Sequence, residues 1–308
     1  MNPSTVLRTP DDRFDNLPDY PFEPHYVAID GGRIRMHYVD DSPVDGSGET
    51  IVMLHGNPSW SYLYRHVIPP LVAAGHRCVA VDLVGFGRSD KLANRFEYTY
   101  EGHVEWLREA LFDRLDLRDV TLVAHDWGGA LGFPLLARTP ERFRRVVAVN
   151  TGLSTGDEDL GEGWPLLANW LQSSQRDNPF EPSKVVEMFT VSALAPAVLA
   201  AYDAPYPEEA YLQGVRQFPL LIPISPRDEN TPALREVWKQ LEKLEIPLLC
   251  AFSDQDHTSG GDHSSVSERI PGAKGQPHTV VENAGHFLQE DQGPALADVI
   301  DDFINSTR

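Results

Sequence analysis

The stretch TLVAHDWGGAL, residues 121–131, constrains the fold of this chain more than any other part of it. Apolar and β-favouring residues lead into an acid, a tryptophan and two glycines, after which the apolar spacing becomes helical. Ala124, Asp126 and Gly128 fit the small-x-nucleophile-x-small pattern of a nucleophile elbow, a tight turn that exposes one side chain above a sheet. The stretch therefore predicts a strand, a sharp turn and a helix, with Asp126 at the apex.

A carboxylate at this apex indicates a different reaction from the serine that esterases carry there. Serine attack on a saturated carbon would form an ether, which has no carbonyl for water to attack. A carboxylate forms an ester, which water can cleave while an oxyanion hole stabilises the tetrahedral intermediate. Asp126 thus indicates displacement at an alkyl carbon followed by hydrolysis. The alternative is that Asp126 only caps the following helix.

Composition limits the classes of protein to which the chain can belong. Its 308 residues, 41% of them hydrophobic, suffice for one large α/β domain or two ordinary ones. No apolar run approaches the roughly 18 residues of a membrane span, and the N-terminus lacks a signal-peptide pattern, so we expect a cytoplasmic protein. The net charge of −20 argues against nucleic-acid and anionic-membrane partners. Cys78 and Cys250 lie in apolar runs, which predicts free buried thiols.

Predicted strands and helices alternate along the first half of the chain. After an irregular arm at 1–24 and a hairpin of 25–30 with 33–40, strands are expected at 50–54, 77–82, 121–125 and 145–149, and helices at about 59–73 and 100–115. The alternation predicts a parallel sheet with helices on both faces. From 150 to about 232 it stops, and short helices such as 183–192 and 196–202 are expected. Strands resume at 246–252 and 276–281, before a last helix at 294–305.

This pattern divides the chain into a core and an insertion. We expect residues 1–150 and 233–308 to form the α/β core domain and residues 151–232 to form a helical cap. The alternative for the insertion is a loop-rich surface domain.

An acid and a histidine must follow the nucleophile in an elbow fold, and the chain has both. Asp254 and Asp256 come after the strand that ends at Phe252, and His286 comes after the strand that ends at Val281. The carboxyl ends of the strands are where open α/β sheets build their sites. His286 would deprotonate water, and the acid would hold the required tautomer of its imidazole. We prefer Asp256 as this acid, with Asp254 as the runner-up.

A leaving halide gathers negative charge, so hydrogen-bond donors must point at it. The indole N–H of Trp127 and the amide N–H of Asn57 suit this role, and the backbone N–H groups of the same two residues could form the oxyanion hole. The alternatives are a turn residue before Pro58 for Asn57 and core packing for Trp127. The chemistry requires no metal and no organic cofactor.

Four motifs together resemble those of the haloalkane dehalogenases of the α/β-hydrolase superfamily. They are HGNPSWSYLYR at 55–65, DLVGFGRSDK at 82–91, HDWGG at 125–129 and NAGHFLQED at 283–291. Epoxide hydrolases share HDWGG, but the combination is specific. The resemblance covers most of the chain, is weakest from 151 to 195, and implies an α/β-hydrolase fold with a mostly parallel eight-stranded sheet and an inserted helical cap.

The resemblance also implies roles for individual residues. Asp126 would be the nucleophile, Trp127 a halide ligand and His286 the base. One branch of the family places its acid where this chain has Asn150, which cannot serve as a carboxylate. The other branch places the acid at the position of Asp256.

The second halide donor is left open by the resemblance. The branch with its acid at the later position takes this donor from a cap tryptophan, which Trp170 matches best and Trp164 less well. Asn57, however, is the donor of the first branch. Asn57, Trp170 or both could therefore hold the halide.

The leading hypothesis is hydrolytic dehalogenation of a haloalkane to a primary alcohol, halide and proton through a covalent alkyl-aspartate. The expected partners are a small halogenated alkane, halide and water, and the expected assembly is a monomer or a weak homo-oligomer. The same core could instead serve an epoxide hydrolase that recruits Tyr202, Tyr206 or Tyr211 as acids. It could also serve a β-lactone decarboxylase or a non-catalytic small-molecule receptor.

Overall fold

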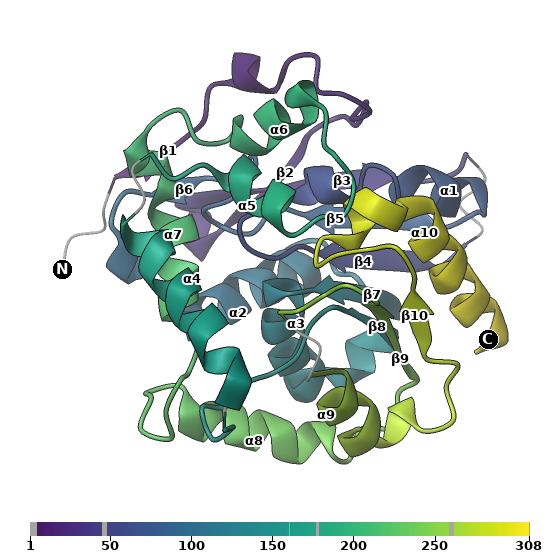
Figure 1. Cartoon of the computed structure of the whole chain (residues 1–308). Helices are drawn as coiled ribbons and strands as arrows, with labels where there is room; N and C mark the ends of the chain where they lie inside the picture. The colour runs from purple at the N-terminus through teal and green to yellow at the C-terminus, as the bar shows by residue number, and fades with distance from the viewer. Residues whose placement is uncertain (1–4, 45–47, 160, 177–178, 259–261, 308) are drawn as a thin grey trace.

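An eight-stranded sheet forms the centre of the computed structural model, which describes residues 5–44, 48–159, 161–176, 179–258 and 262–307. Its strands are β2 (His25–Ile29), β3 (Ile34–Asp41), β4 (Thr50–Leu54), β5 (Arg77–Val81), β7 (Val120–His125), β8 (Phe143–Val149), β9 (Leu248–Ser253) and β10 (Thr279–Val281). They lie in the order β10-β9-β8-β7-β4-β5-β3-β2 (Figure 1). The strands from β10 to β5 pair in parallel, and β3 and β2 join antiparallel. The prediction of a mostly parallel eight-stranded sheet is confirmed.

Successive side chains of the central strands enter two separate cores. Val52 and Leu54 of β4 pack on one face of the sheet, and Ile51 and Met53 pack on the other. The first face is covered by α2 (Tyr100–Arg108), α3 (Trp127–Arg138), α8 (Thr231–Leu241) and α9 (Asp262–Arg269), and the second by α1 (Ile68–Ala73) and α10 (Leu288–Ser306). Burial on both faces explains why these strands are continuous apolar runs.

The two cysteines follow the same division. Cys78 lies in the core on the side of α1 and α10, and Cys250 lies in the opposite core. Both are free and buried, as predicted.

A helical segment separates β8 from α8. It contains α4 (Trp164–Arg176), α5 (Pro182–Met188), α6 (Pro196–Asp203) and α7 (Gln213–Leu220), and its described residues include no strand. Figure 1 shows these helices along the left and upper part of the molecule, whereas α8 lies at the bottom and contacts α3. Residues 160 and 177–178 of the predicted cap lie outside the described residues.

Three predicted helices differ from the observed ones. The helix expected at 59–73 is a 3₁₀ turn (Ser61–Tyr64) followed by α1. The two helices are separate because Pro69 and Pro70, at the start of α1, lack the N–H groups that a continuous helix needs. The helix expected at 100–115 is α2 followed by a π-helix (Glu109–Arg114). The last helix begins at Leu288, earlier than predicted, and bends at Gln292, where φ is −140° and ψ is 38°.

The N-terminal arm is more ordered than predicted. A short strand, β1 (Val6–Leu7), pairs antiparallel with β6 (Lys91–Leu92), and a 3₁₀ turn (Asp11–Phe14) follows. Phe14 and Tyr20 are buried, since each ring packs against Trp60. Apolar anchors among the prolines and aspartates therefore tie the arm to the core. Residues 1–4 lie outside the described residues.

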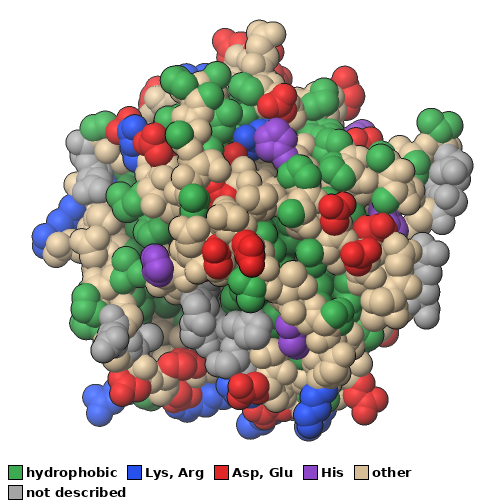
Figure 2. Space-filling view, turned by 45° about the vertical axis from the view of Figure 1, so that its right-hand side comes forward, with side chains coloured by type: hydrophobic (Ala, Val, Ile, Leu, Met, Phe, Trp, Pro, Cys, Tyr) green, Lys and Arg blue, Asp and Glu red, His purple; other side chains and the backbone are tan. Residues whose placement is uncertain are grey.

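Figure 2 shows carboxylates scattered across one face among apolar and uncharged side chains. Within the described part of the chain, no helix is both long and apolar enough to cross a bilayer.

Candidate active site

Asp126 occupies the predicted elbow between β7 and α3. Its backbone is in a positive-φ conformation, with φ 51° and ψ −121°, which is uncommon for a residue other than glycine. Such strain clusters at functional sites. Asp126 stands at the N-cap position of α3, but its side chain makes no capping hydrogen bond. The alternative interpretation of Asp126 as a helix cap is therefore wrong.

Two glycines allow α3 to start this close to the sheet. A Cβ atom on Gly128 would lie 2.1 Å from the carbonyl oxygen of Leu54 in β4, and one on Gly129 would lie 2.0 Å from Oγ1 of Thr151. The same Oγ1 donates a 2.6 Å hydrogen bond to the backbone carbonyl of Asp126. The small residues of the motif are thus required by contacts across the elbow.

The Asp126 carboxylate has a different partner at each oxygen. Oδ1 accepts a 2.8 Å hydrogen bond from the backbone N–H of Asn57, and Oδ2 lies 3.5 Å from Nε2 of His286. Burial opposes ionisation, but the His286 imidazole and the backbone N–H of Trp127 favour it more, so the pKa of Asp126 is lowered. The side chain stays 26% exposed, compared with 9% for His286. It is therefore ionised and the more accessible of the two.

His286 is held on its other side by a buried acid. Its Nδ1 lies 3.1 Å from Oδ2 of Asp256 and 2.8 Å from Oγ1 of Thr258, whose hydroxyl donates a 2.6 Å hydrogen bond to Oδ1 of Asp256. Burial lowers the pKa of His286, but Asp126 and Asp256 outweigh it and raise this pKa to about 10. Thr258 was not found from the sequence, since a threonine two residues after an acid is unremarkable.

The structure separates the two candidate acids. Asp256 is buried against His286, whereas Asp254 is exposed and accepts a 3.1 Å hydrogen bond from the backbone N–H of Ala284. That bond is the main reason why the pKa of Asp254 is lowered. Asp254 therefore shapes the loop before His286, and only Asp256 reaches the imidazole.

Further side chains hold the loop that carries His286. The imidazole of His125 donates from Nε2 to the carbonyl of His286 over 2.8 Å. The amide of Asn150 donates to the carbonyls of Gly285 and His286 over 3.1 and 3.0 Å, and its Oδ1 accepts from the backbone N–H of Ser253. Sequence reasoning treated Asn150 only as a missing acid. Asn150 comes directly after β8, at the same edge of the sheet as the His286 loop, and this position could have indicated its role.

Asn57 and Trp127 both adjoin the nucleophile. Asn57 is buried, and its Nδ2 donates a 3.3 Å hydrogen bond to the carbonyl of Val215 in α7. Trp127 packs edge-on against Phe218, with ring centroids 4.7 Å apart. Its indole N–H donates no hydrogen bond to another described residue. Trp127 thus belongs to the core and still has a donor to offer.

Both cap tryptophans that the sequence offered lie in α4. Trp170 in α4 is partly buried, with its ring centroid 6.1 Å from that of Phe180. It packs against the same hydrophobic core that contains Trp127. Trp164, at the start of α4, is 43% exposed.

The three cap tyrosines have surroundings of their own. Tyr202 is buried and donates its hydroxyl to Glu290. Tyr206 is buried with its ring 5.8 Å from Nζ of Lys91. The hydroxyl of Tyr211 lies 3.5 Å from the backbone carbonyl of Arg8. None of these contacts involves the Asp126 carboxylate.

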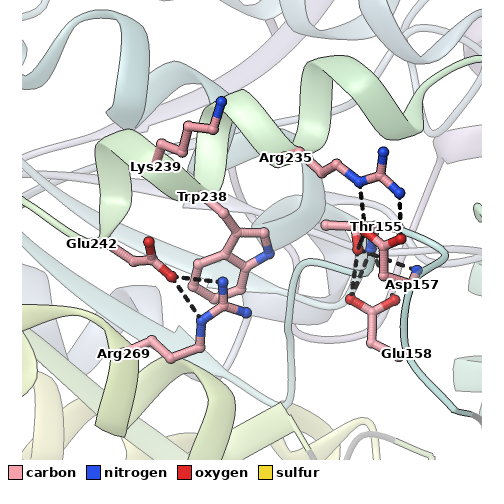
Figure 3. A pocket seen from close by; sticks show the side chains of 8 residues that line it. All are labelled: Thr155, Asp157, Glu158, Arg235, Trp238, Lys239, Glu242 and Arg269. Carbon is pink, nitrogen blue, oxygen red and sulfur yellow. Dashed lines mark hydrogen bonds and ion pairs between the residues drawn. The ribbon is translucent and has the colours of Figure 1, made fainter. Parts of the chain in front are cut away.

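A surface pocket of about 340 Å³ lies away from these residues, between α8, α9 and residues 155–158. Figure 3 shows two ion pairs among the side chains that line it, Arg235 with Asp157 and Arg269 with Glu242. None of the residues that line this pocket belongs to the group around Asp126 and His286. The described residues include no cluster of three or more His, Cys, Asp or Glu side chains that could hold a metal ion.

Comparison with known proteins agrees with this geometry. Residues 49–292 match the family profile of the alpha/beta hydrolase fold. A haloalkane dehalogenase from Psychrobacter cryohalolentis is 49% identical over 303 residues, covering 97% of this chain and 98% of the relative. One from Mycolicibacterium paratuberculosis is 45% identical over 299 residues, covering 96% and 97%. The tetrameric structure of a haloalkane dehalogenase from Paraglaciecola agarilytica superposes with a TM-score of 0.86 at 34% identity, covering 96% of this chain and 97% of that chain.

The family profile covers both the elbow and the His286 loop, so the chain is an α/β hydrolase. The chain belongs to the haloalkane dehalogenase family within that class.

Proposed function

We propose that this protein hydrolyses the carbon–halogen bond of haloalkanes, giving a primary alcohol, halide and a proton through an ester on Asp126. One observation carries the proposal. An ionised, partly exposed carboxylate has one oxygen held by the backbone N–H of Asn57 and the other facing the imidazole of His286. The close relatives that are haloalkane dehalogenases support it.

In the first step, a carboxylate oxygen of Asp126 attacks the carbon that carries the halogen. A carbon–oxygen bond forms, the carbon–halogen bond breaks, and the halide leaves with the bonding electron pair. Donors that point at the leaving group stabilise its growing charge most in a site from which water is excluded. The unpartnered indole N–H of Trp127 is adjacent to the nucleophile and suits this role.

In the second step, His286 takes a proton from water, and the resulting hydroxide attacks the ester carbonyl carbon. The backbone N–H groups of Asn57 and Trp127 stabilise the oxyanion. When the tetrahedral intermediate collapses, its carbon–oxygen bond to the alkoxide breaks, and the alkoxide takes the proton held by His286 and leaves as the alcohol. The carboxylic acid left on Asp126 then releases its proton to solvent and is a carboxylate again. Asp256 holds the imidazole in the tautomer that leaves Nε2 free to accept the proton.

The first step prepares the base for the second. In the free enzyme two carboxylates raise the pKa of His286 to about 10, which would keep the imidazole protonated at neutral pH. Once Asp126 becomes a neutral ester, one of those charges is gone and the pKa falls. His286 then becomes able to accept a proton when the water must be activated.

Halide release and mass spectrometry test the function directly. Purified protein should release bromide from 1-bromobutane, and Asp126→Asn should abolish the release. His286→Ala should still be alkylated, so its mass should rise by one butyl group at Asp126. Bromide release by Asp126→Asn at the wild-type rate would refute the proposed nucleophile. Tight binding of bromobutane without release or adduct would favour a receptor.

The halide donors can be tested by substitution. A hydrogen bond to a charged partner contributes about 1.5–3 kcal/mol, so Trp127→Phe should weaken bromide binding by roughly 10- to 100-fold. Quenching of tryptophan fluorescence by bromide gives the dissociation constant. Trp170→Phe and an Asn57 variant should show whether one or both supply the second donor. The exposed Trp164 provides the control, since Trp164→Phe should leave the constant unchanged.

Residues 151–232 are proposed as the cap domain on the core formed by 1–150 and 233–308. The helices α4 to α7 between β8 and α8 support this division, and the contact of α8 with α3 supports a boundary near residue 231. We also propose a monomer or weak homo-oligomer, which light scattering after size exclusion would test against the tetramer of the Paraglaciecola relative. A cytoplasmic location stays a prediction of the sequence.

A further inference from the structure

Two consecutive acids follow His286 in the first turn of α10, and neither belongs to the reaction described above. Glu290 and Asp291 are the last two residues of the NAGHFLQED motif. Each contacts the helical segment between β8 and α8 as well as the core. We define residues 189–192, which follow α5 in that segment, as the latch segment.

The Asp291 carboxylate joins the latch segment to the His286 loop. Oδ2 accepts a 2.9 Å hydrogen bond from the backbone N–H of Gly285, the residue before His286. The carboxylate also accepts from the backbone N–H of Val191 over 3.1 Å and from that of Ser192 over 2.7 Å. Hydrogen bonds to an ionised acceptor are about twice as strong as neutral ones. One side chain therefore ties together two segments about a hundred residues apart in the sequence.

The two segments also touch through their backbones. The N–H of Phe287 donates to the carbonyl of Phe189 over 3.4 Å. A Cβ atom on Gly285 would lie 2.4 Å from the same carbonyl oxygen, so only glycine permits this approach. The ring of Phe189 stands edge-on to that of His286, with centroids 6.5 Å apart. Movement of the latch segment would therefore displace the loop that carries His286.

Glu290 makes a second connection between the core and the helical segment. Its side chain is buried, forms a two-pronged ion pair with Arg65 of the core, and accepts a hydrogen bond from Tyr202 of α6. The start of α10 is consequently fixed to both the core and α6. Because Glu290 fixes the start of α10, the position of the neighbouring Asp291 is fixed as well.

We propose that Asp291 is a positioning residue that holds His286 in place through Gly285 while anchoring the latch segment over it. This inference rests on the proposed function. In that mechanism Asp126 acts in both steps, but His286 acts as a base only in the second step. A displacement of about 1 Å can cost roughly 100-fold in rate. Loosening the loop therefore slows decay of the alkyl-enzyme and spares its formation.

Asp291→Asn tests this role. The amide keeps the shape but turns one acceptor oxygen into a donor, so one of the two segments loses its hydrogen bond. Rapid-quench experiments with 1-bromobutane measure the bromide burst, and mass spectrometry follows decay of the alkyl-enzyme. We expect a burst rate within about 3-fold of wild type and a decay rate roughly 10- to 100-fold lower. Asp302→Asn, an exposed position on α10, is the matched control and should change neither rate.

Equal losses in both rates, or no loss in either, would overturn the proposal. If Asp291→Asn does not fold, Ser192→Pro removes one N–H from the latch segment alone and should give the same selective slowing; equal losses there would also overturn it. Failure of the proposed function is a separate result, because wild-type protein would then show neither burst nor adduct.

Discussion

Replacing Asp126 by asparagine should lower the pKa of His286 strongly, because the neutral amide imitates the charge of the alkyl ester. Oδ2 of Asp126 lies 3.5 Å from Nε2 of His286. At that separation and an effective dielectric constant of about 20, Coulomb's law gives about 5 kcal/mol. One pKa unit corresponds to about 1.4 kcal/mol, so the pKa should fall by about 3.5 units from its value of about 10, close to neutrality.

The assay is a pH titration of the His286 imidazole by NMR in protein labelled with nitrogen-15. Wild-type protein should stay protonated through neutral pH, and Asp126→Asn should titrate near it. Asp254→Asn is the matched control, since Asp254 is exposed and bonds to the backbone of Ala284 instead. It should leave the titration of His286 almost unchanged. If Asp126→Asn and wild type titrate at the same pH, the proposed coupling between ester formation and base activation is refuted.

The same coupling should appear in stability. The folded-state pKa of His286 lies above its unfolded value of 6.5, so the stabilising contribution of its charge is complete below pH 6.5 and is lost as the pH rises toward 10. Free energies of unfolding in urea should fall over this pH range more in wild type than in Asp126→Asn. The same pH dependence in both proteins would contradict the coupling. Gly128→Ala should lower the free energy of unfolding by roughly 3 kcal/mol or more, because its Cβ would clash with a carbonyl of β4. Gly163→Ala, which meets no neighbour, should change it by less than about 0.5 kcal/mol when both variants are unfolded in urea. Arg65→Met should cost roughly 3–5 kcal/mol by leaving the buried Glu290 carboxylate without its cation, and substitution of both Arg65 and Glu290 by methionine should cost less. A larger loss in the double variant would contradict the ion-pair argument.

Local patterns determined most of the fold. Apolar strands, turns at glycine and a switch to helical spacing are set by neighbours in the sequence, so the parallel strands and the elbow at Asp126 could be predicted. The eight-stranded sheet was implied by the resemblance of the motifs. Helix ends were less predictable. The π-helix after α2 and the early start of α10 at Leu288 depend on packing between distant elements.

The sequence by itself determined the chemistry of the elbow: a carboxylate at a strained apex, an acid and a histidine after later strands, and donors beside the nucleophile. Tertiary structure decided which acid reaches His286. Asp254 and Asp256 differ by two positions, yet one contacts the backbone and the other the imidazole. It also revealed that Asn150 and Asp291 hold the His286 loop, through contacts that span more than a hundred residues for Asn150 and six for Asp291. The physical reason is that the partner a side chain can reach depends on where the loops after neighbouring strands lie relative to one another. Those relative positions exist only once the sheet has formed.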